Sequence, residues 1–335
     1  MESNVINDQK MDKDGQYQAL IDEVFSCDIC SCRNIQFSGK SKAKGRKKLP
    51  FCGVYENAPL EAQSEMKERG ILNCWNFWHG SLDAKIMVVG QDFGHFPSLT
   101  NDSESYSFRK CLDDRAYTDI NDMASPTDRT LAKLFRDNLG LEIIEAVNSE
   151  PNPDLYFTNL VCCYRRQNTP VSGDAGYSLR CAHYCAEAFM GKLLDIIRPQ
   201  VMIVLGRNTF KALSHVKDME LRIYDGDGHA WPYNGRRRKG EPVLDKYSEV
   251  VSGQYHYRLI RSDGRCSVDV FPVYHPGPFI HANQSEQDQL ESWKRIKADL
   301  KQKGMRSISM EMSPCDGGIA GFNYQGTPVT ELPAI

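Results

Sequence analysis

The sequence predicts an α/β fold, a three-layer sandwich with a central, mostly parallel four-stranded sheet. The first observation is a set of four short apolar runs rich in β-branched residues, at 85–90, 155–161, 201–206 and 269–274. The second is a set of helical patterns between and after these runs, at 127–140, 185–199 and 285–304. Strands that alternate with helices favour parallel pairing, with helices on both faces of the sheet.

The pattern divides the chain into one domain with two loose ends and an insertion. We expect a flexible N-terminus over 1–17, a domain over 18–304 that starts with a short amphipathic helix leading into Cys27, and a C-terminal tail over 305–335. Residues 215–268 lack helical periodicity and contain the turn signals DGDG, NGRRRKG and SDG, so we predict an inserted β-hairpin region there.

Composition limits the class of protein. The 335 residues include 41% hydrophobic and 25% charged side chains and have a net charge of −3, values typical of a globular protein. The longest apolar runs, such as 201–205, are much shorter than a membrane helix of about 20 residues. The polar N-terminus lacks the apolar core of a signal peptide. We therefore expect a cytoplasmic, monomeric protein without a membrane partner.

Basic residues gather in three places along this slightly acidic chain. Residues 40–48 contain six basic side chains and no acidic one, Arg236–Lys239 form a second run, and Arg165 and Arg166 form a third. Such runs indicate an anionic polymer, such as DNA, as a partner.

Polar residues follow or close each predicted strand. They are Gln91 and Asp92 after the first, Asn159 near the end of the second, Arg207 and Asn208 after the third, and His275 after the fourth. The carboxyl ends of parallel strands meet at one edge of the sheet, where α/β proteins bind their ligands. We therefore expect an acid, an amide and an imidazole to converge at that edge.

The clustered cysteines indicate metal binding. Of the twelve cysteines, one group contains Cys27, Cys30 and Cys32, and a second contains Cys162, Cys163, Cys181 and Cys185. In a reducing compartment such groups bind metal more often than they form disulfides. The Cys27-x2-Cys30 spacing fits zinc and an iron–sulfur cluster equally well, so both stay open at this point.

Seven short motifs then follow one another in a characteristic order. They are Cys27-x2-Cys30, GQDFG (90–94), TNLVCC (158–163), Cys185, IRP (197–199), VLG (204–206) and HPGPF (275–279). Over roughly residues 18–300 this order resembles the uracil-DNA glycosylase superfamily, in particular its iron–sulfur (family 4-like) members. The resemblance implies a uracil-DNA glycosylase-like fold. It also implies a monofunctional glycosylase of base excision repair, which flips uracil out of DNA and hydrolyses its N-glycosidic bond.

The resemblance also implies a cofactor. A 4Fe-4S cluster would be held by Cys27, Cys30, Cys163 and Cys185, with Cys181 as the alternative fourth ligand and a structural zinc as the alternative metal. Both TNLVCC and CAHYC offer two cysteines, and Cys32 adds a spare one at the first motif.

By the same resemblance, the catalytic residues would be Asp92 and His275. Asp92 would stabilise the sugar cation and position water, and His275 would hold the departing base. The residues that would bind the flipped base are Gln91, Phe93 and Asn159. Phe279 would enter the duplex as a wedge.

The first motif departs from the iron–sulfur pattern. GQD at 90–92 matches the members that are most selective for uracil, but Gly94 stands where those members have the tyrosine that excludes a 5-methyl group. We therefore expect other deaminated or 5-substituted pyrimidines to enter the pocket. The alternative function is a non-catalytic iron–sulfur or zinc module that recognises damaged or single-stranded DNA.

Overall fold

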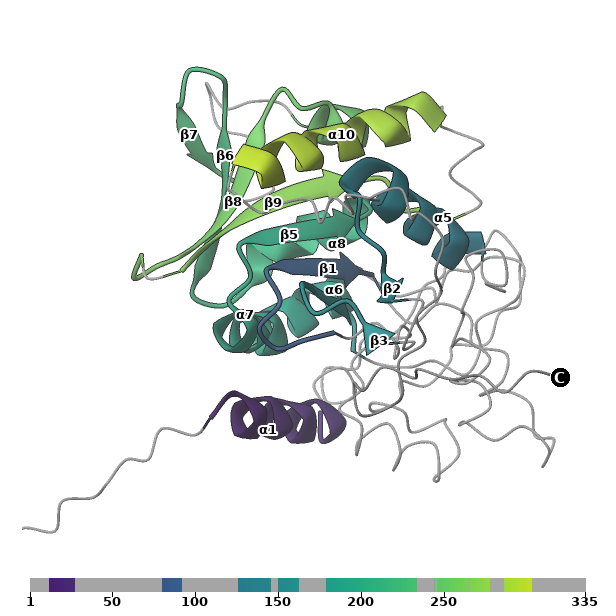
Figure 1. Cartoon of the computed structure of the whole chain (residues 1–335). Helices are drawn as coiled ribbons and strands as arrows, with labels where there is room; N and C mark the ends of the chain where they lie inside the picture. The colour runs from purple at the N-terminus through teal and green to yellow at the C-terminus, as the bar shows by residue number, and fades with distance from the viewer. Residues whose placement is uncertain are drawn as a thin grey trace, which may run out of the picture.

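A seven-stranded sheet forms the centre of the molecule (Figure 1). The structure is a computed structural model, and it describes residues 12–27, 80–91, 126–145, 150–162, 179–233, 244, 246–264, 266–277 and 286–302. The strand order is β4-β1-β5-β9-β8-β6-β7. A separate two-stranded ladder pairs β2 (Ile144–Glu145) with β3 (Glu150–Pro151).

The first four strands of this order are parallel, as the sequence predicts. They are β4 (Leu155–Asn159), β1 (Ile86–Gly90), β5 (Val201–Leu205) and β9 (Ser267–Val273). Every residue of β4, β1 and β5 is buried. Strands with both faces covered need apolar side chains on both sides, which explains their continuous apolar runs.

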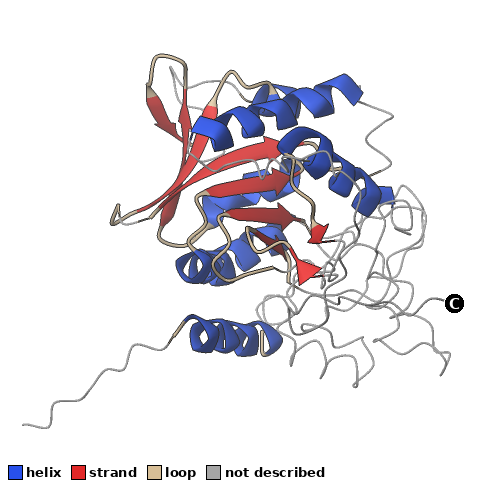
Figure 2. Ribbon diagram, viewed as in Figure 1, coloured by secondary structure: helices blue, strands red, loops and turns tan. Residues whose placement is uncertain are grey.

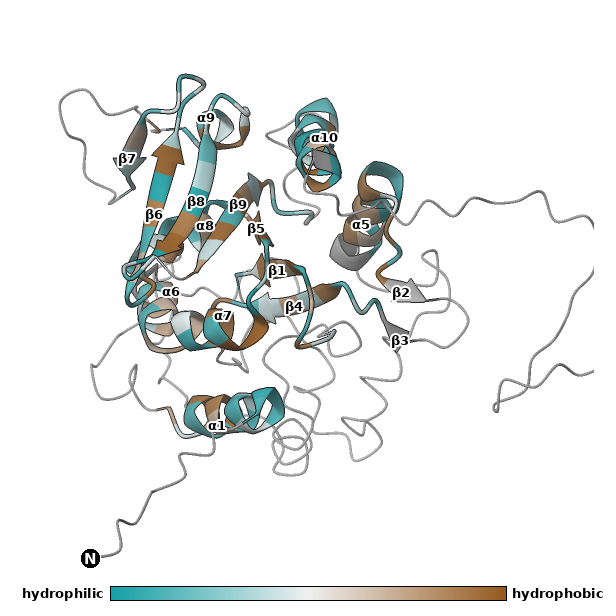
Figure 3. Cartoon of the chain, turned by 60° about the vertical axis from the view of Figure 1, so that its left-hand side comes forward, coloured by the Kyte–Doolittle hydropathy of each residue, from teal (hydrophilic) through white to brown (hydrophobic). Residues whose placement is uncertain are grey.

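The prediction of four strands was wrong, because the inserted region continues the same sheet. Here β8 (His256–Arg261) pairs antiparallel with β9, β6 (Met219–Tyr224) with β8, and β7 (Ala230–Pro232) with β6. Buried and more exposed residues alternate along most of β6 and β8, and Figure 3 shows the matching alternation of apolar and polar colour along β6. Such strands give a weaker sequence signal than a continuous apolar run.

Helices cover both faces of the sheet, as Figure 2 shows. On one face lie α5 (Pro126–Leu134), the π-helical turn η4 (Phe135–Leu139) and α10 (Glu286–Gln302). The Phe135 ring contacts both Trp293, with centroids 5.0 Å apart, and Phe157, with centroids 5.9 Å apart. This aromatic contact joins α10 to the parallel part of the sheet.

The opposite face is covered by two helical segments, one before and one after β5. The first consists of α6 (Leu179–Cys185), the π-helical turn η5 (Ala186–Met190) and α7 (Gly191–Ile197), and the second of α8 (Arg207–Ala212) and the 3-10 turn η6 (Leu213–His215). Helix α1 (Lys13–Phe25) packs on α7. No described helix is long and apolar enough to cross a membrane.

Two helix starts differ from the sequence prediction. Helix α1 begins at Lys13, before the expected start at Gln18, because Asp12 caps it by accepting a hydrogen bond from the Gly15 N–H at 2.8 Å. The helix predicted over 185–199 is already helical at Leu179. Cys185 therefore lies within this helix, at the junction with η5, rather than at its head.

Candidate active site

The polar residues singled out at the strand ends share one edge of the sheet. Asn159 pairs in register with Gly90, which precedes Gln91, and Leu205 pairs with Val273, two residues before His275. The arrows of β1 and β5 in Figure 1 point to the same side of the molecule. With a strand spacing of about 4.8 Å, β4 and β9 are separated by roughly 14 Å at this edge.

Asn159 closes β4 with a buried and unsatisfied side chain. It is 1% exposed, and neither its Oδ1 nor its Nδ2 has a hydrogen-bond partner among the described residues. An amide that loses water without gaining a partner costs about 1–3 kcal/mol. An asparagine amide offers two N–H donors and one acceptor, so it can pair with a ligand that carries both kinds of group.

His275 lies just beyond β9 with a defined tautomer. The N–H of Gly277 donates to His275 Nδ1 at 3.1 Å, so Nδ1 is the acceptor and the ring proton lies on Nε2. Burial lowers the pKa of His275 to about 4, which keeps the imidazole neutral near pH 7. The ring therefore presents an uncharged N–H donor at Nε2.

The chain that leads to His275 is anchored at Val273. Its carbonyl oxygen accepts hydrogen bonds from the N–H of Gly206 at 2.9 Å and from the hydroxyl of Tyr247 at 2.8 Å. Gly206 has φ of +91°, a conformation that favours glycine. Tyr247 belongs to α9 (Tyr247–Val251), in the inserted region. The sequence carries no signal for this contact, because it depends on how the insertion packs against β9.

Gln91 is held by residues that follow the two strands on either side of β1. The N–H of Val161, just beyond β4, donates to the main-chain carbonyl of Gln91 at 2.9 Å. On the other side Asn208 Nδ2 donates to Gln91 Oε1 at 3.2 Å. These contacts place Gln91 between the segment carrying Asn159 and the start of α8.

Several predicted site residues lie outside the described part of the chain. They are Asp92, Phe93, Phe279, Cys30 and Cys163. The structure therefore brings Gln91, Asn159 and His275 to one edge of the sheet and leaves the predicted roles of the other residues as predictions.

Three thiols from separate segments lie near one another. The pKa of Cys162 is raised well above its usual value, first by its hydrogen bond to Cys185, then by burial, and further by nearby Cys27. Cys27 and Cys185 are two of the four predicted cluster ligands. Cys162 is the described thiol beside them; Cys163, the predicted ligand of the same TNLVCC motif, lies outside the described residues, so its role stays a prediction. Cys181 is also buried, one helical turn before Cys185.

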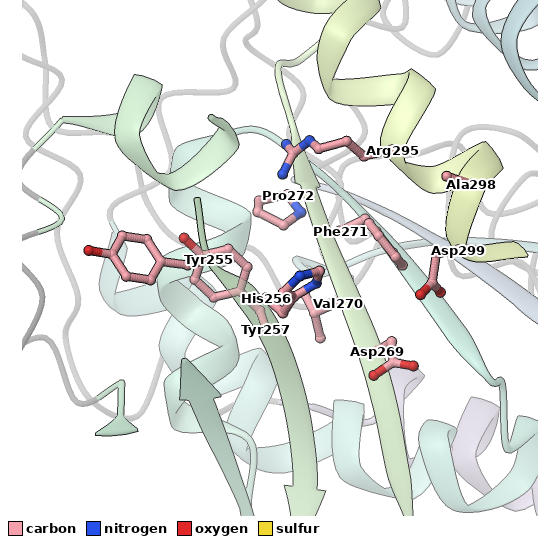
Figure 4. Close-up of a pocket in the computed structure, with 10 residues that line it drawn as sticks. All are labelled: Tyr255, His256, Tyr257, Asp269, Val270, Phe271, Pro272, Arg295, Ala298 and Asp299. Carbon is pink, nitrogen blue, oxygen red and sulfur yellow. The ribbon is translucent and has the colours of Figure 1, made fainter. Parts of the chain in front are cut away.

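Two other features lie away from the strand-end residues. A cavity of about 250 Å³ lies between β8, β9 and α10. Figure 4 shows its lining, with Arg295 towards one end and Asp269 and Asp299 towards the other. In the turn after β6, Asp225 accepts the N–H groups of Asp227 at 3.0 Å and His229 at 2.9 Å. These hydrogen bonds account for that turn without a ligand.

The fold is that of an α/β protein, and its strand-end residues form a candidate ligand site at the carboxyl edge of the parallel strands. A model of the Uracil DNA glycosylase superfamily matches residues 77–301, which is more than half of the chain. The chain therefore belongs to the uracil-DNA glycosylase superfamily. A search of curated proteins found no match.

Proposed function

We propose that this protein is a DNA repair glycosylase that hydrolyses the N-glycosidic bond of uracil flipped out of DNA. Other deaminated or 5-substituted pyrimidines are expected substrates, because Gly94 replaces the tyrosine expected to exclude a 5-methyl group. Membership of the superfamily supports a glycosylase activity in general. The choice of uracil rests on the residues at the strand ends.

The buried amide of Asn159 carries this proposal. Both of its polar ends lack partners among the described residues, and it closes β4 at the edge where α/β proteins bind ligands. Uracil presents an N–H donor beside a carbonyl acceptor on its pairing edge, and an asparagine amide complements exactly such a pair. A flipped uracil would therefore satisfy Asn159 and recover the cost of burying it.

His275 would stabilise the departing base. Hydrolysis breaks the bond between the sugar C1′ and the base N1, and the bonding electrons leave with the base as an oxyanion. A neutral imidazole with its proton on Nε2 can donate a hydrogen bond to that oxyanion. Water supplies the hydroxyl group at C1′ and gives up a proton that neutralises the released base anion, while Asp92 would position that water and stabilise the cationic sugar.

The remaining predicted residues would hold the base and the DNA. Gln91 and Phe93 would contact the flipped base by hydrogen bonding and stacking, and Phe279 would fill the gap left in the duplex. The basic runs at 40–48 and 236–239 would contact phosphates.

A 4Fe-4S cluster or a structural zinc would fit the group of thiols near α6. Cys27, Cys162 and Cys185 come from three segments, Cys162 forms a hydrogen bond with Cys185 and has Cys27 nearby, and thiols gathered in this way are suitable metal ligands. Cys30 and Cys163, outside the described residues, and Cys181 are candidates for the remaining ligands. Such a group would tie the segment after α1 to β4 and α6.

One assay tests the function. A labelled oligonucleotide containing a single uracil is incubated with excess protein, then cleaved with alkali wherever a base has been removed. Wild type should cut at the uracil, and Asn159→Leu should reduce the single-turnover rate about 10²- to 10³-fold, as for loss of other transition-state donors. The same variant should fold at least as stably, since it replaces an unsatisfied buried amide.

Asn138→Leu is the matched control. Asn138 is also buried, but its Nδ2 donates to the carbonyl of Leu134 at 3.1 Å, within its own helical segment. It should lose about 1 kcal/mol of stability and keep its excision rate. A wild type that binds the oligonucleotide but never removes the base would favour the non-catalytic module instead.

A further inference from the structure

The cavity between β8, β9 and α10 separates two oppositely charged residues of one helix. Arg295 and Asp299 stand four positions apart on α10, and both line the cavity. Opposite charges at this spacing lie on the same face of a helix and commonly pair. Figure 4 instead shows the two side chains directed towards different ends of the cavity. Among the described residues, no carboxylate forms an ion pair with Arg295.

The Arg295 side chain is held at its end of the cavity by α9 and the turn that follows it. Its Nη2 donates a hydrogen bond to the carbonyl of Val251, the last residue of α9. The side chain also lies across Gly253, so closely that a Cβ on that residue would collide with it. Burial lowers the pKa of Arg295, but a guanidinium stays charged and has five N–H donors. This half-buried cation would therefore be stabilised by an anion in the cavity.

Carboxyl groups lie at the opposite end of the cavity. Asp299 reaches it from α10 and Asp269 from β9 (Figure 4). Asp269 also pairs with Arg258, whose Nε lies 3.1 Å from its Oδ1. Burial raises the pKa of Asp299, and the nearby His256 opposes this effect. An end of this kind favours the part of a ligand that carries N–H donors or a positive charge.

We propose that this cavity binds a small zwitterion, a molecule of amino-acid size with a carboxylate at one end and an ammonium group at the other. The carboxylate accepts hydrogen bonds from Arg295, and the ammonium group donates to Asp299. The volume of about 250 Å³ lies below the roughly 300–1,000 Å³ of pockets for drug-sized ligands, so it suits such a small molecule. The partly exposed rings of Tyr255 and Phe271 provide an apolar wall for the carbon chain between the two charges.

A series of ω-amino acids tests the site and measures the separation of its two ends. Glycine, β-alanine, 4-aminobutyrate and 6-aminohexanoate carry the same two charges at increasing distances. Each is added at millimolar concentration to the full chain, and thermal unfolding and calorimetric binding are recorded. A ligand that binds only the folded protein raises the melting temperature in a saturable way. One chain length should give the largest rise. The acid and the amine of that length, with one charge each, should bind about tenfold more weakly or worse.

Two variants each remove one of the charges that would hold the ligand. Arg295→Gln keeps an amide donor for the Val251 carbonyl, and Asp299→Asn keeps the shape of the side chain, so both should fold, which urea unfolding checks. Each should weaken binding of the best ω-amino acid by about tenfold or more. Lys294→Gln is the matched control, because it removes an exposed cation of the same helix that does not line the cavity. It should bind as wild type does.

Three results would overturn the inference. One is the absence of saturable binding by every member of the series. Another is an equal loss of binding in Lys294→Gln and Arg295→Gln, which would show a general effect of charge. The third is an acid that binds as tightly as the amino acid of the same length, because the site would then select anions alone. None of these measurements involves excision of uracil, so their outcome is independent of the proposed glycosylase activity.

Discussion

The hydroxyl of Tyr247 donates to the carbonyl oxygen of Val273 at 2.8 Å, two residues before His275. The donor belongs to the inserted region and the acceptor to the last strand of the parallel sheet. Burial raises the pKa of Tyr247 well above its usual value, so the hydroxyl keeps its proton and remains a donor. Helix α9 thus supports the segment that carries the proposed leaving-group donor.

Removing this hydroxyl should affect the chemical step. Tyr247→Phe keeps the ring but leaves the Val273 carbonyl with only the Gly206 N–H, so His275 should be held less firmly. We expect a several-fold lower single-turnover excision rate and a loss of about 1 kcal/mol in urea unfolding. Tyr257→Phe is the control, since its hydroxyl donates to Val250 at 3.1 Å in the same region. Equal rates for the two variants would contradict a role in positioning His275.

The low pKa of His275 predicts that the excision rate stays constant to an unusually low pH. If the neutral ring acts as donor, the excision rate should hold as pH falls through 6.5, the usual histidine pKa, and should decline only near pH 4. Single-turnover rates between pH 4 and 8 measure this. A half-maximal rate near pH 6.5 that moves in His275→Gln would show a solvated imidazole instead.

The same pKa makes stability depend on pH. Between pH 6.5 and about 4 the unfolded chain binds a proton at His275 that the folded chain excludes, so stability is intact above pH 6.5 and is lost as pH falls. His275→Gln should flatten the dependence of urea unfolding on pH in this window. Burial, and then the nearby His215 on which its ring is stacked with centroids 3.7 Å apart, lower the pKa of His183 to about 4 as well. His183→Gln should flatten the same dependence but leave excision unchanged.

The two adjacent cysteines after β4 should behave differently. Because Cys162 is the thiol beside Cys185 and Cys27, we expect Cys162→Ala to lose bound metal and colour from a brown protein that otherwise carries about four irons. Iron, zinc and visible absorbance are measured on Cys162→Ala, Cys163→Ala and the control Cys266→Ala. Bleaching by Cys163→Ala alone would favour the ligand named from the motif. A colourless wild type with one zinc would replace the cluster by a zinc site.

The GQD motif gives a prediction about chemistry and base range. Asp92→Asn should keep DNA affinity and lose most of the chemical rate, since an amide stabilises a sugar cation poorly. Wild type should also excise 5-hydroxymethyluracil, and Gly94→Tyr should restrict excision to uracil. Full activity of Asp92→Asn would show that Asp92 does not act in the mechanism. A wild type that excises only uracil would contradict the prediction that Gly94 opens the pocket to 5-substituted bases.

DNA binding should be strongly salt-dependent. Each phosphate contact adds about 0.9 to the slope of log affinity against log salt on duplex DNA. Neutralising the basic side chains of 40–48 and 236–239 should lower this slope and the affinity, without changing the single-turnover rate at saturation. An unchanged slope would show that these runs do not contact DNA.

The sequence predicted the parts of the fold that depend on local patterns. The three strands buried on both faces, β1, β4 and β5, leave continuous apolar runs, and their parallel pairing followed from the helices between them. The three additional strands, β6, β7 and β8, were not predicted as part of this sheet. β6 and β8 are only partly buried, so their short alternating segments resemble loops.

The candidate site was predictable to a similar extent. Asn159 and His275 were identified because a polar residue at a strand end can be read directly from the sequence. Tyr247 was missed because its partner, Val273, is distant in sequence and offers only a main-chain carbonyl. The choice between Cys162 and Cys163 depends on which way each side chain points after β4, which a motif of adjacent cysteines does not determine.

The π-helical turn η5 begins immediately after Cys185. A π turn holds one residue more than a regular helical turn, and one residue corresponds to a rotation of about 100° around the helix axis. The angular position of Cys181 and Cys185 relative to the core side chains of α7 therefore depends on that extra residue. A single deletion within 186–190 would restore a regular helix but rotate the Cys185 thiol about a quarter-turn away from Cys162. The length of this helix is thus as much a part of the thiol site as the cysteines themselves.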